Sequence, residues 1–111
     1  MATKEEAIMA YVMVVGKWPL SSSDDIGKVT LEVLSKPASD FIKRREIFST
    51  AAGEDGLKSY VLVEIEDEHL NDGLKRLAED FIAFRVVPGY TYSFETLMGM
   101  EESMAAVGLK I

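Results

Sequence analysis

The amino-acid sequence predicts an α+β domain of the βαββαβ kind, in which two helices cover one face of a four-stranded antiparallel sheet. Four β-rich segments and two amphipathic helical segments follow one another in the order strand, helix, strand, strand, helix, strand. The two middle strands are joined by a short glycine-containing turn, which is typical of a hairpin. The chain has 111 residues, of which 48% are hydrophobic, so residues 1–111 are expected to form a single domain.

The first predicted strand covers residues 9–18, a continuous apolar run that ends before Pro19. Such a run is typical of a strand buried on both faces, so we expect it near the centre of the sheet. The first predicted helix covers residues 24–35. The serines at positions 21–23 offer N-cap oxygens for it, and Pro37 ends it.

Residues 41–51 and 57–66 are predicted to pair as a β-hairpin around a turn at residues 52–56. In the strand at residues 57–66, Val61, Val63 and Ile65 are expected on one face, and Tyr60, Leu62 and Glu64 on the other. In the strand at residues 41–51, neighbouring residues such as Arg44 and Arg45 are expected to point to opposite faces.

The second predicted helix covers residues 68–84, where an apolar stripe should pack on the sheet. Asp80 is expected on the opposite, solvated side. Pro88 and Gly89 then turn the chain into a fourth strand at residues 90–98. Residues 99–111 are expected to form a C-terminal arm or a short helix.

One face of this sheet is expected to lack a covering layer, because both helices lie on the other face. Both faces of the first and third strands nevertheless carry apolar residues. We therefore expect the uncovered face to meet a partner, most simply a second copy in a symmetric homodimer.

Three segments carry a resemblance to a known family: YVMV at residues 11–14, GLKSYVLVE at residues 56–64 and FRVVP at residues 84–88. They resemble the dimeric α+β-barrel superfamily and, within it, a small family known as domain of unknown function 3303. The resemblance implies a ferredoxin-like fold, two sheets facing each other in a homodimer, and a small-molecule cavity between sheet and helices. Members of the superfamily include enzymes and ligand-binding regulators, so the fold alone does not specify a function.

The composition of the chain limits the kinds of partner and the cellular location that we expect. The net charge is −7, from 19 acidic and 12 basic residues, so we expect no nucleic-acid partner. Cysteine is absent, which excludes disulfides and thiolate chemistry and fits a cytoplasmic location. We recognise no targeting segment, and the first apolar run is too short to span a bilayer, so no membrane association is expected.

The residues that could act as acid or base are few. His69 is the single histidine, and Glu64 and Glu95 lie on predicted strands, where burial would raise their pKa toward neutrality. These three are the predicted catalytic residues. No phosphate loop, nucleophile elbow, zinc spacing or dinucleotide fingerprint occurs in the sequence, so no cofactor and no metal are expected.

A second group of residues is predicted to bind a substrate or ligand. A strand tyrosine can place its ring in a pocket wall and its hydroxyl on a ligand, and arginine can bind a carboxylate bidentately. The group consists of Tyr11, Trp18, Arg44, Arg45, Tyr60 and Tyr92.

Three functions remain open from the sequence. The first is a homodimeric small-molecule-binding or accessory protein with an apolar pocket between sheet and helices. The second is a cofactorless enzyme of the monooxygenase or isomerase type, acting on a small apolar or aromatic substrate. The third is a protein-interaction module. A pocket lined by tyrosine and an inward carboxylate would favour the enzyme, an apolar pocket would favour carriage, and a filled core would favour the interaction module.

Overall fold

The computed structural model describes residues 8–50 and 56–109, so most of the predicted turn at 52–56 lies outside the described residues. The strands are β1 (Met9–Trp18), β2 (Ile42–Ser49), β3 (Leu57–Glu66) and β4 (Thr91–Leu97). The α-helices are α1 (Ser23–Leu34), α2 (Leu70–Ile82) and α3 (Met100–Ala106). Short 3-10 turns, η1 (Leu20–Ser22), η2 (Asp67–His69) and η3 (Ala83–Val86), flank α1 and α2.

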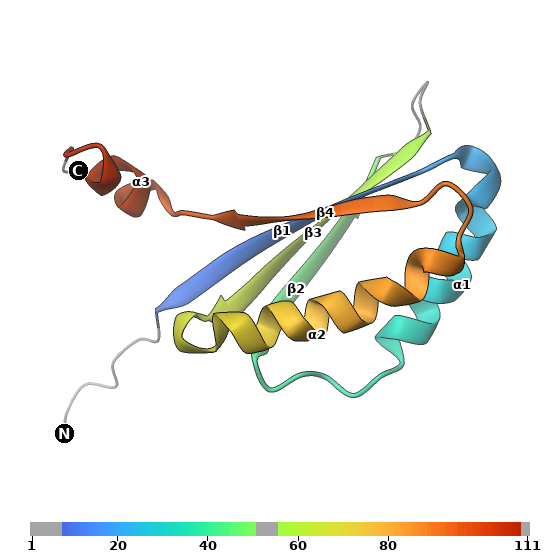
Figure 1. Ribbon diagram of the computed structural model, residues 1–111, viewed down its shortest axis with the longest axis horizontal. Helices are drawn as coiled ribbons and strands as arrows, with labels where there is room; N and C mark the ends of the chain where they lie inside the picture. The colour runs from blue at the N-terminus through green and yellow to red at the C-terminus, as the bar shows by residue number, and fades with distance from the viewer. Residues whose placement is uncertain (1–7, 51–55, 110–111) are drawn as a thin grey trace.

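The strands form one sheet in the order β2-β3-β1-β4, and each neighbouring pair is antiparallel. The predicted α+β class with a four-stranded antiparallel sheet is therefore confirmed. β1 lies inside the sheet, where Val14 pairs with Val61 on one side and with Phe94 on the other. In Figure 1, α1 and α2 lie on the same side of the sheet.

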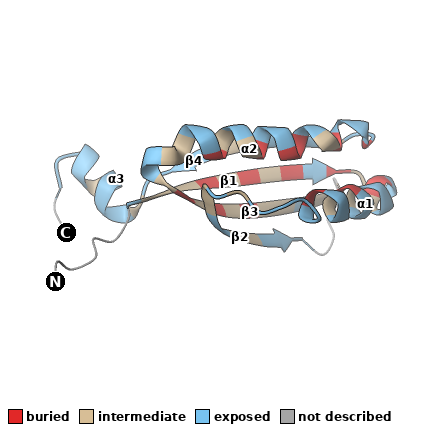
Figure 2. Cartoon of the chain, turned by 90° about the horizontal axis from the view of Figure 1, so that it is seen from below, coloured by how far each residue is buried: buried red, intermediate tan, exposed pale blue. Residues whose placement is uncertain are grey.

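The hydrophobic core lies between the sheet and these two helices. It is formed by alternate residues of the inner strands and by the apolar stripes of α1 and α2: Val12, Val14, Val29, Val33, Val61, Val63, Ile65, Leu77 and Phe81, joined by Phe84 and Val87. Figure 2 shows these buried residues on the strand-facing side of α2 and along β1. The 3.6-residue and two-residue periodicities of the sequence account for which side chains enter the core.

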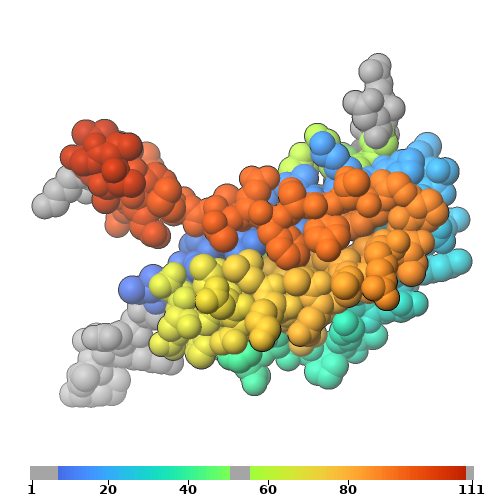
Figure 3. Space-filling model, viewed as in Figure 1, coloured from blue at the N-terminus to red at the C-terminus, as the bar shows by residue number. Residues whose placement is uncertain are grey.

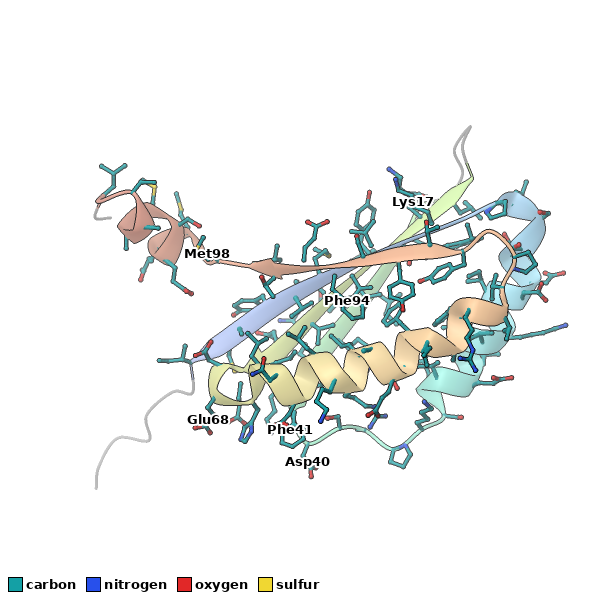
Figure 4. All side chains as sticks on the ribbon, viewed as in Figure 1. Lys17, Asp40, Phe41, Glu68, Phe94 and Met98 are labelled. Atoms are coloured by element: carbon teal, nitrogen blue, oxygen red, sulfur yellow. The ribbon has the colours of Figure 1, made fainter. Side chains whose placement is uncertain are left out.

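The opposite face of the sheet, here called the open face, is not covered by α1 or α2. It carries the other set of alternating residues, including Tyr11, Met13 and Leu62, which are partly buried, and Phe48, which is 56% exposed. Figure 4 shows Lys17 pointing away from the helices, whereas Phe94 points from β4 toward α2. The open face thus combines apolar and charged side chains on a twisted surface.

The C-terminal segment leaves the domain as an arm that ends in α3. Figure 3 shows this arm standing clear of the body formed by the sheet and the two longer helices. Its apolar side chains Met98, Met100, Val107 and Leu109 are all exposed. Among the described residues, no helix is both long enough and apolar enough to cross a bilayer.

The start of α1 differs from the predicted serine cap. Ser22 makes no capping hydrogen bond with its side chain. Its hydroxyl is buried and donates instead to the carbonyl oxygen of Pro88 at 2.6 Å. This bond ties the start of the first helix to the turn before β4, because a buried hydroxyl needs a partner.

The largest correction concerns Asp80, which the sequence pattern places on the solvated side of the second helix. The structure buries it, with 1% of the residue exposed. Asp80 lies three residues after Leu77 and four before Phe84, so it shares the inward face with them. Partner cations compensate its charge, which is the condition for burying a carboxylate.

Candidate functional site

A cavity lies between α1, the second half of α2 and the neighbouring parts of β2 and β3, and we call it the inner cavity. Its volume is about 140 Å³. The apolar part of its wall includes Ile26, Val33, Val61, Phe81 and Phe84. The inner cavity thus lies between the sheet and the helices.

Small side chains on the sheet leave room for the inner cavity. Ser49 and Ser59, opposite each other on β2 and β3, both line it. On β1, the neighbouring residue is Gly16, where an added Cβ would lie 2.5 Å from the Tyr90 hydroxyl and 2.9 Å from Ser59 Oγ. Glycine is therefore required for the Tyr90 ring to lie against the sheet.

Tyr90 and Trp18 form the aromatic end of the inner cavity. The Tyr90 ring lies 4.9 Å from the ring of Phe84 and 6.3 Å from that of Trp18, measured between centroids. Burial, together with the neighbouring Tyr92, raises the pKa of Tyr90 to about 12. The Tyr90 phenol is therefore neutral at physiological pH, where it can donate a hydrogen bond but cannot serve as a phenolate base.

Asp80 lies at the other end of the inner cavity, within a cluster of basic side chains. Its Oδ1 atom is 3.1 Å from Arg76 Nε and 3.5 Å from Lys36 Nζ, and its Oδ2 atom is 3.4 Å from Arg45 Nη2. The Asp80 side chain is 2% exposed, whereas those of Arg45 and Arg76 are each 23% exposed. One buried carboxylate thus binds three cations.

A second hollow of about 250 Å³, here called the basic cleft, opens beside this cluster. Its walls come from the end of α1, the segment that connects α1 to β2, the start of β2, and α2. Five basic residues line it: Lys36, Lys43, Arg44, Arg45 and Arg76. Val33, Leu34 and Arg45 line both the inner cavity and the basic cleft, so the two hollows adjoin.

The predicted ligand-binding residues are divided between the two faces of the sheet. Trp18 and Arg45 line the inner cavity, and Arg44 lines the basic cleft. Tyr92 lies on the helix side, 5.5 Å from Phe81 between ring centroids, but is not part of the cavity wall. Tyr11 and Tyr60 lie on the open face, where they pair with Glu64 and with Val15 and Phe48 respectively.

The predicted catalytic residues do not converge on one site. Glu64 lies on the open face, with its Oε2 atom 3.6 Å from Arg44 Nη1. Glu95 is exposed on the same face, opposite Met13. His69 lies before α2, with Nδ1 3.3 Å from an oxygen of Asp72. None of the three lines the inner cavity.

His69 also belongs to a group that offers metal-ligand atoms. Glu66, Glu68 and His69 each place one such atom within 4.8 Å of the others. Figure 4 shows Glu68 at the surface near the start of α2, and the ring of Phe41 lies 4.9 Å from that of His69. Glu66 already pairs with Lys43 Nζ at 3.1 Å, so the group does not form a dedicated ligand set.

Sequence reasoning missed four residues that the structure brings to this region: Lys36, Arg76, Asp80 and Tyr90. A signal for Asp80 was present, because it follows Leu77 by three residues and so falls within the apolar stripe. Arg76, four residues before Asp80, is the matching helical partner. No local signal connects Lys36 with this helix, since the two lie 44 residues apart.

Neither a protein-family model nor a curated protein sequence matches this chain. Among solved structures, it is similar to the crystal structure of a DUF3240 family protein from Shewanella baltica OS155. The TM-score is 0.39 and the sequence identity 12%, over 80% of this chain and 91% of that chain. The resemblance to domain of unknown function 3303 is not confirmed by these comparisons and stays a prediction.

Proposed function

We propose that this protein binds a small, largely apolar molecule in the inner cavity. The observation that carries the proposal is a void of about 140 Å³ beneath α1 with mostly apolar walls. An engineered apolar cavity of about 150 Å³ binds benzene, so a space of this size suits one small ring or a short aliphatic chain. A few polar groups at the ends of an apolar pocket are typical of ligand sites.

The proposal includes a homodimer in which two ferredoxin-like sheets face each other as a dimeric α+β barrel. Two features support it. The open face carries Tyr11, Met13 and Leu62 without a covering helix, and a surface of this kind is stabilised by burial against a partner. The arm that ends in α3 exposes further apolar side chains beyond the domain that a second copy could cover.

Filling the inner cavity tests ligand binding. Thr30 lines the cavity from α1, so Thr30→Phe should occupy much of the void. Leu31→Phe is the matched control, because it introduces the same side chain on the same helix at a residue that is 71% exposed. Binding of benzene and indole is measured by amide chemical shifts of the labelled protein.

We expect the wild type and Leu31→Phe to show saturable shifts in residues around the inner cavity, and Thr30→Phe to bind at least about tenfold more weakly. Equal binding by all three proteins would place any ligand elsewhere. Absence of binding to the wild type by every small apolar probe would contradict the proposed function.

A cofactorless enzyme is the second candidate, because Tyr90 and Asp80 both line the inner cavity. Ligand binding ranks first, since both oxygens of Asp80 are engaged by cations and the Tyr90 phenol is neutral. Prolonged incubation of the protein in air with a bound ligand, followed by mass analysis of that ligand, separates the two. Recovery of an altered ligand that is absent from the Thr30→Phe incubation would favour the enzyme.

A further inference from the structure

We infer that the ligand is an anion with an apolar body, and specifically a small carboxylate whose body lies in the inner cavity and whose carboxylate lies in the basic cleft. This inference rests on the proposed function and names the chemical class of its ligand. Two observations support it: the excess of positive charge around Asp80, and the residues that line both the inner cavity and the basic cleft.

The charge around Asp80 is unbalanced. Three cations share one carboxylate: Lys36, Arg45 and Arg76. Among the described residues, Asp80 is the carboxylate that lies within ion-pair distance of all three. The local excess is therefore two positive charges, in a chain whose net charge is −7. A concentration of one sign of charge in a hollow with low-dielectric walls attracts the opposite charge.

The other two basic residues of the basic cleft have acidic partners of their own. Lys43 pairs with Glu66 at 3.1 Å, and Arg44 pairs with Glu46 and Glu64. The excess thus belongs to the three cations around Asp80. Arg76 is held in place from a second direction, since its Nη2 donates to the Pro37 carbonyl oxygen at 2.7 Å.

Arg45 and Lys36 are the cations best placed to meet a ligand. Their contacts with Asp80 are long, at 3.4 and 3.5 Å, compared with 3.1 Å for Arg76. A guanidinium has five donors, so Arg45 can bind a second carboxylate while it still faces Asp80. The Lys36 side chain is 45% exposed and can turn toward an anion in the basic cleft.

The position of Arg45 specifies the shape of the ligand. Arg45 lines both hollows, together with Val33 and Leu34 at the end of α1. A molecule that fills the inner cavity can therefore reach the basic cleft past the Arg45 guanidinium. An apolar group joined to a carboxylate by a short link satisfies both environments, whereas a neutral apolar molecule leaves the excess positive charge around Asp80 uncompensated.

The test compares two probes that differ mainly in charge, phenylacetate and its neutral isostere phenylacetamide, by calorimetry and amide chemical shifts. For the wild type we expect phenylacetate to bind at least about tenfold more tightly, as a charge-assisted hydrogen bond provides. Arg45→Gln should remove most of this preference while phenylacetamide binding changes little. Arg85→Gln is the matched control, because it makes the same change of charge at an exposed arginine on η3 and should keep the preference.

Lys36→Gln is the second variant. Because Lys36 is exposed, this substitution should leave the fold intact, so it provides the test if Arg45→Gln fails to fold. It should reduce the preference for phenylacetate several-fold. Equal binding of the two probes by the wild type would overturn the carboxylate assignment. A preference that survives both Arg45→Gln and Lys36→Gln would overturn the position of the carboxylate in the basic cleft. Either result leaves the proposed function standing. Failure of both probes and of benzene and indole to bind would remove the proposed function and this inference together.

Discussion

Tyr90 illustrates how single residues shape the inner cavity. Its ring contacts Phe84 on one side and lies close to Gly16 on the sheet. Removal of the phenol from water disfavours its charged form, and proximity to Tyr92 adds to this effect, so the pKa rises from 10.0 to about 12. The fold therefore holds the Tyr90 proton more tightly than the unfolded chain does.

This difference predicts an alkaline loss of stability. Below pH 10 the phenol is protonated in both states, and its contribution to stability is fully present. As the pH rises from 10 toward 12, the unfolded chain ionises first, so the free energy of unfolding decreases. In a titration followed by tyrosinate absorbance, Tyr90 of the wild type should ionise near pH 12.

Tyr90→Phe should remove that late ionisation, and Tyr11→Phe, on the open face, should retain it. Survival of the late step in Tyr90→Phe would assign the raised pKa to another tyrosine. The chain has four tyrosines, so a loss of one quarter of the total absorbance change is the expected amplitude for each variant.

At the scale of elements, the approach of α2 to the sheet depends on Gly73. An added Cβ at this position would lie 2.6 Å from Cδ1 of Ile65 on β3. Ile65 is fully buried, so its side chain has little room to move. A glycine in the first turns of a helix costs stability in isolation, and here the close packing of helix on strand offsets that cost.

Gly73→Ala and Gly27→Ala form a matched pair of substitutions in two helices. At Gly27, on α1, an added Cβ meets no atom within 4 Å, so alanine should stabilise the protein by about 1 kcal/mol through its helix propensity. At Gly73, overpacking against Ile65 should outweigh that gain and destabilise the protein by about 1–2 kcal/mol. Urea denaturation measures both, and a stabilising Gly73→Ala would show that α2 can shift away from β3.

β2 shows how an element can follow its predicted pattern only in part. Ile42 pairs with Ile65 and Arg44 pairs with Glu64, so Lys43 is an extra residue in the strand. Beyond this irregularity, Arg45 pairs with Val63 and so faces the helices, while Arg44 faces away from them. The split of the two arginines between faces, which the sequence predicts, is what directs Arg45 toward Asp80.

At the scale of the whole molecule, the arm makes the shape extended. The radius of gyration is 16.5 Å, compared with roughly 13 Å for a compact domain of this length. The largest extent is 53 Å and the smallest 20 Å. A second copy on the open face would cover apolar surface that the isolated chain leaves in water.

We therefore expect native mass spectrometry to detect a dimer. Leu62→Arg places a charge in the middle of the open face, opposite Met13, and should give monomers. Leu31→Arg introduces the same side chain at an exposed position on α1 and should leave the dimer intact. A monomeric wild type at its highest soluble concentration would contradict the homodimer.

The sequence by itself determined the order and the approximate limits of the strands and helices of the sheet domain. It also indicated the apolar stripe of α2, whose Leu77 enters the core. These features depend on hydrophobic periodicity and on turn residues, which act over a few neighbouring positions. For β1 and β3, both faces are apolar in the sequence, so the structure decided that Val14 and Val63 face the helices. The expectation of a hollow between sheet and helices came from the family resemblance, and of the predicted ligand-binding residues Trp18 and Arg45 line the inner cavity.

Only the tertiary structure decided which side chains meet. Asp80 pairs with Arg45, 35 residues away, and with Lys36, 44 residues away. Such pairs depend on how helices cross the sheet and on how much room small residues such as Gly73 leave. The volume of a cavity and the balance of charge at its edge are sums over contacts between distant segments, so local patterns in a single sequence do not contain them.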